Sequence, residues 1–476
     1  MPAEPEPAQI RLERDWLGEK EVPADALYGI QTARALENFP ISGERALPEF
    51  IVATAMVKKA AAAANMKIDR LPEELGIPIR DAAEEIIRGK WHDQFVVDAF
   101  QAGAGTSHNM NANEVIANRA LEILGRQRGD YETVNPNDHV NMSQSSNDVF
   151  PTAMRLAGLE LGGRLLTAAS ELEDVCWEKA EEFNNVLKSA RTHLRDAVPI
   201  RLGQEFGAYA VTLAKCQRRI RAGLDGLKEL NIGATAVGTG INSTVTYRVF
   251  ALEELREYTG APDLRPPEDW VEVTQSARDF LDVSGALRDL AVSLLKIAGD
   301  LKLMFSGPTT GFAEIELPAV QPGSSIMPGK LNPSVPEMME MVCYQVMGND
   351  LVIAEASASG GQLDLNTMTP VIARNLLGSL KILTNAVAVF TEKCVRGISA
   401  NEERCRTLAE HSLGLATALG PKIGYSAASE VAQEALASGK PIREVVVEKG
   451  ILTPQEIDDL LKPTELTEPG IPGAEG

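Results

Sequence analysis

Aromatic residues are scarce in this chain. They make up 5% of its 476 residues, although hydrophobic residues reach 44%. The core must therefore consist mainly of Ala, Leu, Ile, Val and Met, a composition that favours helices packed closely on helices. Because 476 residues exceed the size of one compact core, more than one domain is expected.

Basic residues are also few, and this limits the possible partners. The 46 Lys and Arg face 67 Asp and Glu, and the net charge of -21 disfavours nucleic acid and anionic membranes as partners. No apolar run reaches membrane-spanning length and no secretion signal is evident, so we expect a cytoplasmic protein. The five Cys and five His are scattered without CxxC or HExxH spacing, which disfavours a disulfide framework and a zinc site.

Long amphipathic helices are the clearest pattern present. Apolar residues recur every three or four positions in four segments, as one face of a helix requires. The segments are 161–175, 206–227, 280–304 and 376–394. Several helices of this length predict an all-α protein with a central bundle of long helices. Since one chain would leave much of their apolar surface uncovered, we also expect a homo-oligomer with a pooled helical core.

Punctuation by proline, glycine and helix caps predicts three consecutive domains. Residues 1–143 mix short helices with Pro and Gly and form the expected N-terminal domain. Residues 144–398 hold the long helices, and residues 399–476 form a small C-terminal helical domain. Within the last domain, Ser399 and Asn401 are candidate N-caps, and Thr453 and Glu456 match a capping box.

Three clusters of small polar residues interrupt the helical pattern. In 103–114 and 143–148, the simplest interpretations are helix caps and a buried amide network. The third cluster, Arg191-Thr192-His193, precedes an Ala-Val-Pro segment that is expected to stop the preceding element. A single histidine in such a place is more often structural than catalytic. None of the three clusters indicates a function by itself.

The fourth interruption, residues 318–336, has a clearer functional signature. It reads PAVQPGSSIMPGKLNPSVP between two predicted helices, and its five prolines exclude a helix. A loop of this length inside a helical array is usually functional. Ser324, Ser325, Lys330 and Asn332 supply hydroxyls, a cation and an amide for binding an anion. A nucleotide-binding P-loop is disfavoured because Leu331 stands where that motif requires a hydroxyl.

Taken together, these segments resemble one enzyme family. GSSIMPGKLNP (323–333), GTSHNMNANE (105–114), SQSSND (143–148) and RTHLRDAVP (191–199) are similar to motifs of the fumarase/aspartase superfamily, and within it of the aspartate ammonia-lyases. The similarity covers nearly the whole chain. It implies a homotetramer with a central helix bundle, in which each active site gathers residues from three subunits.

The resemblance also implies a mechanism and its residues. L-aspartate would lose a C3 proton to Ser324 and then ammonia, through an enediolate. Donors on the charged carboxylate would come from Thr106, Ser145, Ser146 and Ser325, while Lys330 and Asn332 would hold the other carboxylate. The amino group would contact Asn147, Thr192 and His193. Ser146, Thr309 and Thr369 depart from residues that are usual in aspartases.

Two other functions remain open at this point. A class II fumarate hydratase would use the same carboxylate-binding residues with L-malate. A non-catalytic helical scaffold is the alternative from another class, because some members of the superfamily serve as lens proteins. The resemblance implies that no organic cofactor is required, and activation by a divalent cation such as Mg²⁺ is left open. A small dicarboxylate and further copies of the chain are the expected partners, and nothing in the sequence marks a metal site.

Overall fold

The computed structural model describes residues 9–473 and is mostly helical, so the predicted all-α class is confirmed. Two compact units are present. Unit 1 contains the described chain up to Leu166, Arg218–Asp289 and Tyr344–Thr384, and unit 2 contains the remainder. The division cuts each of the longest helices once. Because it does not follow consecutive segments of sequence, the three predicted domains stay a prediction.

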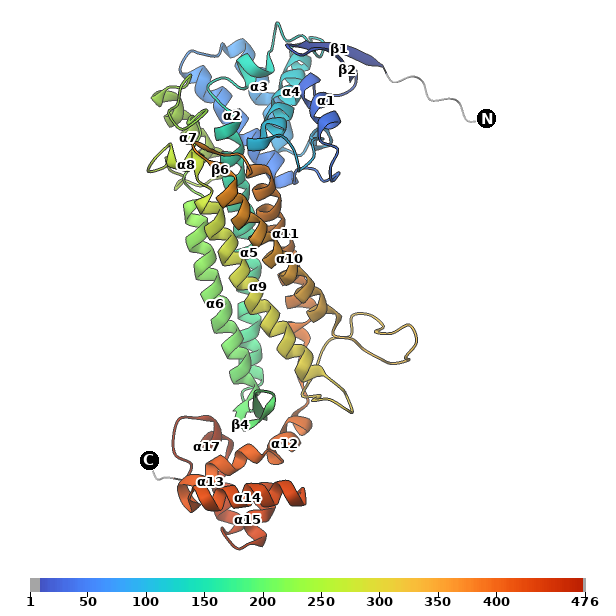
Figure 1. The fold of residues 1–476 in the computed structure, drawn as a ribbon, viewed down its shortest axis with the longest axis vertical. Helices are drawn as coiled ribbons and strands as arrows, with labels where there is room; N and C mark the ends of the chain where they lie inside the picture. Colours follow the sequence, from blue (N-terminus) through green and yellow to red (C-terminus); the bar gives the residue numbers. More distant parts are fainter. Residues whose placement is uncertain (1–8, 474–476) are drawn as a thin grey trace, which may run out of the picture. The chain divides into compact units, whose positions relative to one another are not determined.

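Five long helices carry the chain through both units (Figure 1). They are α5 (Ser146–Glu182), α6 (Leu202–Gly226), α9 (Arg278–Phe305), α10 (Ser334–Ser359) and α11 (Thr369–Lys393). The apolar stripes predicted from the sequence fall on four of them, and every residue of the stripe 280–304 that we used is buried. Leu227 and Cys394 lie one residue beyond the ends of their helices. The predicted long helices are therefore confirmed.

Polar contacts within each unit show which long helices are neighbours. In unit 1, Ser284 of α9 donates to Asp350 of α10 at 2.6 Å, and Asn349 of α10 donates to Ser379 of α11 at 2.9 Å. In unit 2, Tyr209 of α6 donates to Asp300 of α9 at 2.8 Å. Glycine allows closer approach in unit 1, where a Cβ on Gly162 of α5 would meet Leu224 of α6 at 2.5 Å. These contacts describe a helix bundle.

The first part of unit 1 is a layer of shorter helices around its own core. It comprises α1 (Ile30–Asn38), α2 (Pro48–Lys67), α3 (Glu73–Ile87) and α4 (Thr106–Ile123), with a hairpin of β1 (Ile10–Asp15) and β2 (Gly18–Pro23). Ala60–Ala64 of α2 are buried, and their small side chains allow α3 and α7 (Val245–Thr259) to pack closely. Short α8 (Glu272–Gln275) precedes α9. Single turns occupy η1 (His92–Gln94), η2 (Gly103–Gly105) and η3 (Pro136–Val140).

The C-terminal part of unit 2 has a separate apolar core of small helices. Asn401 caps α12 (Glu402–Glu410), accepting from the Arg404 N–H at 3.1 Å, and Thr453 and Glu456 form the predicted capping box of α16 (Pro454–Leu460). The other elements are η4 (Val395–Gly397), η5 (Leu413–Leu415), α13 (Ala416–Ile423), α14 (Tyr425–Ser438), α15 (Ile442–Glu448) and α17 (Pro463–Thr467). The N-cap at Asn401 and the capping box are confirmed, whereas Ser399, the other candidate N-cap, lies in strand β8 (Ser399–Ala400) instead.

Short two-stranded sheets complete the fold. Strand β3 (Leu187–Thr192) pairs antiparallel with β4 (Arg195–Arg201), and the Ala-Val-Pro segment lies inside β4 instead of stopping an element. The other pairs are β5 (Ile315–Glu316) with β8 (Ser399–Ala400), and β6 (Gly361–Gln362) with β7 (Leu365–Asn366). All five cysteines are buried, and none of them forms a disulfide within residues 9–473. Across residues 9–473, the helices are too short or too polar to cross a membrane.

Candidate functional site

The proline-rich loop predicted from the sequence is present in unit 2 between β5 and α10. Residues 317–333 form neither helix nor strand. The loop turns back over Ser324, whose Oγ accepts the backbone N–H groups of Ile326 at 3.2 Å and Met327 at 2.9 Å. Hydrogen bonds to an oxygen favour its anionic form over its neutral form. Ser324 therefore carries a hydroxyl in a setting that stabilises an alkoxide.

Two contacts close the neck of this loop. The Gly323 N–H donates to the Lys330 carbonyl at 3.0 Å, and the Asn332 side-chain amide donates to the Gly323 carbonyl. A Cβ on Gly323 would lie 2.4 Å from the Lys330 oxygen, so only glycine allows the two sides of the neck to come this close. The Lys330 side chain is exposed. One amide donor of Asn332 is thus used in closing the loop, while the Lys330 ammonium projects from it.

Thr192 and His193 lie at the tip of the β3–β4 hairpin in unit 2. His193 and Leu194 form its two-residue turn with φ of 58° and 57°. Both values lie in the left-handed region that Asn and Gly favour in such turns, so His and Leu are strained there. Thr192, His193 and Leu194 are all exposed. The hairpin presents polar and apolar side chains at a conformationally costly position.

A buried ion cluster holds strand β3 of the same hairpin. Glu314 is fully buried, and its carboxylate pairs with Arg191 at 2.8 Å and with Lys188 at 3.2 Å. The Arg191 guanidinium also lies over the Phe312 ring, 4.1 Å from its centroid. Lys188 contacts Glu205 as well, and burial raises the pKa of Glu205 while Lys188 opposes that rise. Because Glu314 immediately precedes β5, this cluster joins the hairpin to the strand that leads into the loop.

The candidate residues of unit 1 lie where α4 and α5 begin. Ser146 Oγ accepts from the Asn109 side chain at 3.0 Å, and Asn109 and Asn113 both donate to Asn141 at 3.2 Å. The buried amide network expected for 103–114 is therefore confirmed. Thr106, the first residue of α4, is exposed, and its hydroxyl donates a long 3.4 Å hydrogen bond to the Gly103 carbonyl.

Asp148 stabilises the start of α5 from within this network. Its carboxylate accepts the N–H groups of Ser145, Gly233 and Thr235 at 2.9 to 3.0 Å. Burial nevertheless raises the pKa of Asp148 to about 6. Burial also lowers the pKa of the Lys58 ammonium to about 7, which Asp148 opposes, and Lys58 donates to the amide groups of Asn141 and Gln144 at 2.9 Å. Two buried ionisable groups thus lie beneath residues 143–148.

Asn147 and Thr369 line one very small cavity of unit 1. Its volume of about 10 Å³ is close to the space for a single water molecule. The Thr369 hydroxyl is buried and has no hydrogen-bond partner among residues 9–473. The Asn147 amide donates to the Ala236 carbonyl at 2.7 Å. The Thr369 hydroxyl can therefore still form a hydrogen bond beside Asn147, the residue that we expect to contact the amino group of the substrate.

The predicted site residues fall into two groups by unit. Unit 1 brings together the starts of α4 and α5, which carry Thr106 and Ser145–Asn147. Unit 2 contains the hairpin tip with Thr192 and His193, and the loop with Ser324, Ser325, Lys330 and Asn332. In the described part of the chain, no group of three or more His, Cys, Asp or Glu is arranged to hold a metal ion.

Sequence reasoning missed Lys188, Glu205 and Glu314. Each is a charged residue in a helical or strand-like context, where exposure is the usual expectation. Arg191 was quoted only for its place beside Thr192, and Lys58 was not considered. Their burial follows from tertiary packing. The only signal in the sequence was the position of Glu314 between Phe312 and the proline-rich loop, a short polar interruption within an apolar stretch.

Family models match most of the chain. The model described as "Lyase" matches residues 18–348, and the model described as "Fumarase C C-terminus" matches residues 415–468. The first match contains every candidate site residue. The second covers the small helices of the C-terminal core.

Full-length relatives and solved structures agree with these matches. Proteins named aspartate ammonia-lyase from Bacillus sp and Escherichia coli (strain K12) are 51% and 46% identical, covering 98% and 97% of this chain and 99% and 96% of theirs. A Brucella melitensis structure titled fumarate lyase:delta crystallin bound to cobalt is 51% identical with a TM-score of 0.93. A class II fumarase from Schistosoma mansoni is 37% identical, also with a TM-score of 0.93. The alignments cover 97% of this chain and 100% of each structure. At this identity and coverage, the chain belongs to the fumarase/aspartase superfamily of lyases.

Proposed function

We propose that this protein is an aspartate ammonia-lyase, which converts L-aspartate reversibly to fumarate and ammonia by anti-elimination. The relatives named for this activity are 46% to 51% identical over nearly their whole length. The observation that carries the mechanism is the pair of N–H groups on Ser324 Oγ. In this role, deprotonated Ser324 takes the C3 proton of the substrate and becomes a neutral hydroxyl.

The electrons left on C3 pass into the neighbouring carboxylate and form a doubly charged enediolate. That species then expels the amine, the C–N bond breaks, and fumarate forms. Each preorganised donor on the enediolate is worth about 3 kcal/mol by comparison with oxyanion holes. We assign these donors to Thr106, Ser145, Ser146 and Ser325. The Thr106 hydroxyl is exposed and makes a long 3.4 Å hydrogen bond to the Gly103 carbonyl, which suits a group that binds substrate.

The remaining assignments follow the charges of the substrate. The Lys330 ammonium and Asn332 hold the second carboxylate, and Asn147, Thr192 and His193 contact the amino group. A strained turn at His193 is consistent with a binding role, since strain persists where surrounding contacts hold it. Asn332 keeps its amide oxygen and one further N–H available beyond the bond to Gly323.

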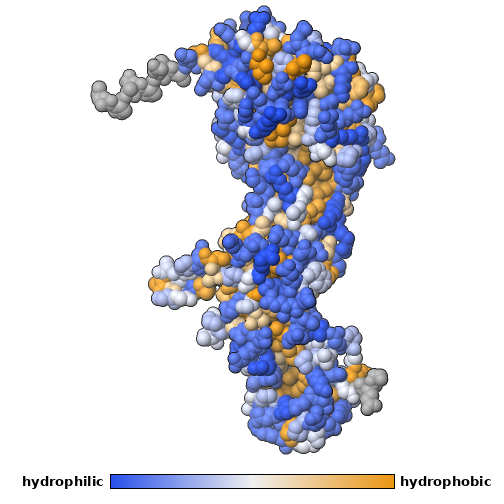
Figure 2. Space-filling model, turned by 180° about the vertical axis from the view of Figure 1, so that it is seen from behind, coloured by the Kyte–Doolittle hydropathy of each residue, from blue (hydrophilic) through white to orange (hydrophobic). Residues whose placement is uncertain are grey.

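The proposed assembly is a homotetramer with active sites shared among subunits. Long helices that expose large apolar side chains support it, and patches of hydrophobic surface are visible on the face in Figure 2. On α10, Met341, Tyr344 and Leu351 are 68%, 59% and 63% exposed and recur at helical spacing. Such a stripe is expected to pack on another helix. Analytical ultracentrifugation would give the number of subunits.

One pair of assays tests the function. Fumarate formation, followed by its ultraviolet absorbance, is measured from L-aspartate and from L-malate with the same preparation. Turnover of aspartate with little turnover of malate supports the proposal. The reverse result would identify a fumarate hydratase, an alternative favoured by the similarity to class II fumarase. An assembled protein that is inert with both substrates would favour a helical scaffold. The same assays with and without a chelator show whether a divalent cation such as Mg²⁺ activates the protein.

A further inference from the structure

The hydroxyl of Ser146 is held from one side by Asn109. Its Oγ accepts a hydrogen bond from the Asn109 side-chain amide at 3.0 Å, at the partly exposed start of α5. A serine hydroxyl has one proton and two lone pairs. Because Asn109 uses one lone pair, the proton points in another direction, and within residues 9–473 no acceptor takes it. The proton of Ser146 is therefore free for a ligand.

The direction of this hydrogen bond is fixed by Lys58. The Lys58 amine donates to Asn141 Oδ1 at 2.9 Å, and Asn141 Nδ2 donates to the Gln144 carbonyl at 3.4 Å. These two contacts identify the oxygen of the Asn141 amide. The Asn109 atom that lies 3.2 Å from this oxygen must be the nitrogen Nδ2, and the same nitrogen reaches Ser146. Asn109 is thus a donor toward Ser146 and cannot accept the serine proton.

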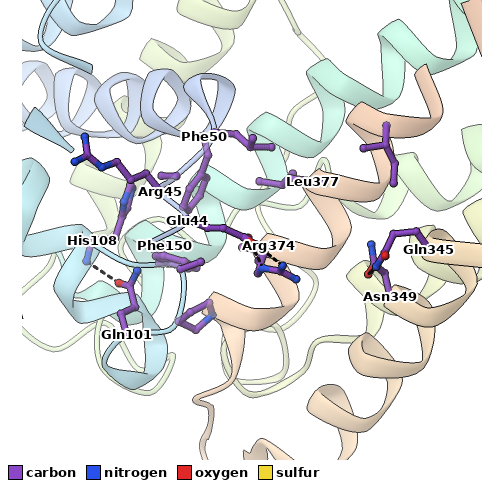
Figure 3. Close-up of a pocket in the computed structure, with 17 residues that line it drawn as sticks. Glu44, Arg45, Phe50, Gln101, His108, Phe150, Gln345, Asn349, Arg374 and Leu377 are labelled. Atoms are coloured by element: carbon purple, nitrogen blue, oxygen red, sulfur yellow. Dashed lines mark hydrogen bonds and ion pairs between the residues drawn. The ribbon is translucent and has the colours of Figure 1, made fainter. Parts of the chain in front are cut away.

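The segment that carries Asn109 is fixed in the core. Asn109 is 1% exposed, and both N–H groups of its amide donate hydrogen bonds. The residue before it, His108, stacks on Phe50 with ring centroids 4.6 Å apart, and the His108 backbone N–H donates to Gln101 at 2.7 Å (Figure 3). A side chain that is locked by its neighbours can hold a partner within the roughly 0.5 Å that a catalytic group requires.

Ser146 depends on such a partner for its orientation. A serine hydroxyl has three staggered positions, and the side chain lacks the β-branch that restricts threonine. A donor to the enediolate must point at the place where negative charge develops. The hydrogen bond from Asn109 excludes the direction toward Asn109 for the serine proton. Accepting a hydrogen bond also polarises the hydroxyl and makes it a stronger donor.

We propose that Asn109 is a positioning residue of the lyase site. By donating to Ser146 Oγ, it holds the hydroxyl in place and directs its proton to the enediolate. This inference rests on the proposed function, in which Ser146 is one of the enediolate donors. Asn109 does not touch the substrate in this role, because it is buried and both of its N–H groups are occupied.

Asn113 is a matched control on the same helix. It lies one turn after Asn109 on α4, is fully buried, and donates to the same Asn141 oxygen at the same distance of 3.2 Å. Its amide also donates to Met110 Sδ at 3.3 Å, and not to Ser146. The side-chain oxygens of both asparagines have no hydrogen-bond partner among residues 9–473, so truncation of either residue removes only donors. For the proposed site, the two residues differ in the contact to Ser146.

A double-mutant cycle tests the proposal. Fumarate formation from L-aspartate gives kcat and KM for the assembled full-length Asn109→Ala, Ser146→Ala and double variants, and urea unfolding gives their stability. One net hydrogen bond corresponds to a factor of about 2 to 12, so Asn109→Ala should lower kcat by this factor at nearly constant KM. Ser146→Ala should lower kcat by about 10²- to 10³-fold. In that background, Asn109→Ala should have no further effect.

Two more variants separate positioning from loss of stability. Asn113→Ala should change kcat by less than about twofold with or without the Ser146 hydroxyl, although it also removes a buried donor. Asn109→Leu fills the space of the amide without a donor, and it removes an oxygen that has no partner. It replaces Asn109→Ala in the cycle if that variant does not fold.

Three results would overturn the proposal. They are an equal loss of kcat from Asn109→Ala with and without the Ser146 hydroxyl, an unchanged kcat in Asn109→Ala, and a loss in Asn113→Ala as large as that in Asn109→Ala. If Ser146→Ala keeps full kcat, Ser146 is not an enediolate donor and the inference is wrong with it.

Failure of the proposed function gives a different result. A wild type that converts L-malate and not L-aspartate contradicts the aspartase proposal alone, and the cycle is then measured with L-malate, whose carboxylates would meet the same residues. A wild type that is inert with both acids overturns the proposed function and this inference together.

Discussion

Replacing Ser324 by alanine removes one oxygen from the proline-rich loop and, with it, the proposed base. In the folded chain that oxygen accepts the N–H groups of Ile326 and Met327. Both residues are exposed, so water can take over the two hydrogen bonds when the hydroxyl is lost. No apolar core depends on this side chain. The free energy of unfolding should therefore change by less than about 1 kcal/mol.

The effect on turnover should be far larger. A positioned acid or base contributes about 10²- to 10⁴-fold, and no other group in the loop can accept a proton in the same place. We expect kcat for L-aspartate to fall by at least about 10³-fold, or roughly 4 kcal/mol in the barrier. The KM should stay nearly constant, because the lost interaction belongs to the transition state.

The assay compares Ser324→Ala with Ser325→Ala, a neighbouring change of equal size. Steady-state fumarate formation gives kcat and KM, urea unfolding gives stability, and succinate titration gives ligand affinity. Ser325→Ala should weaken carboxylate binding and slow the reaction less. If Ser324→Ala keeps a tenth of wild-type turnover, or if Ser325→Ala is the more damaging change, Ser324 is not the base. His193 acting through water would then be the first alternative.

Four further changes test other parts of the structure. Gly323→Ala should abolish activity with little loss of stability, because its Cβ would clash with the Lys330 carbonyl. Gly420→Ala places its Cβ in open space and is the control in the activity and stability assays. Lys330→Ala should raise KM at least about 30-fold, since removing one partner of a desolvated charge pair costs about 2 kcal/mol or more; unchanged succinate affinity would contradict this. His193→Ala should lower kcat/KM for aspartate without unfolding the protein, and an unchanged value would leave His193 a structural role. Lys58 is protonated up to about pH 7 when folded but to about pH 10.5 when unfolded. Between pH 7 and 9, the free energy of unfolding of the wild type, measured with urea, should therefore rise by up to about 3 kcal/mol relative to that of Lys58→Met. If the two proteins show parallel curves of unfolding free energy against pH, the pKa of Lys58 is not lowered.

The long helices could be predicted because their signal is local and repeated. In 280–304, apolar residues recur at helical spacing over about seven turns, and all of those we used are buried. The proline-rich loop was equally clear, since five prolines exclude a helix. The interpretation of Asn109 and Asn113 as a buried amide network was also correct. These features depend on neighbours in the sequence.

The hairpin of β3 and β4 could not be predicted in the same way. Its turn consists of His193 and Leu194, although Asn-Gly is the pair that signals such a turn, and Pro199 lies inside its second strand. The burial of Lys188 and Glu314 was hidden for a related reason. Charged residues are expected at the surface unless a partner is brought to them, and the partner here comes from more than 120 positions away along the chain.

The buried ion cluster explains why the strained turn can persist. A turn with φ above zero at His193 and Leu194 has a conformational cost, so it persists only if the strands below it are fixed. Arg191 fixes one strand through its pair with Glu314 and its contact with the Phe312 ring. Glu314 has no exposed surface, so water cannot replace either cation. The buried charges of Lys188 and Glu314, which could not be predicted from the sequence, therefore help to hold His193, which was predicted as a site residue, at the tip of the hairpin.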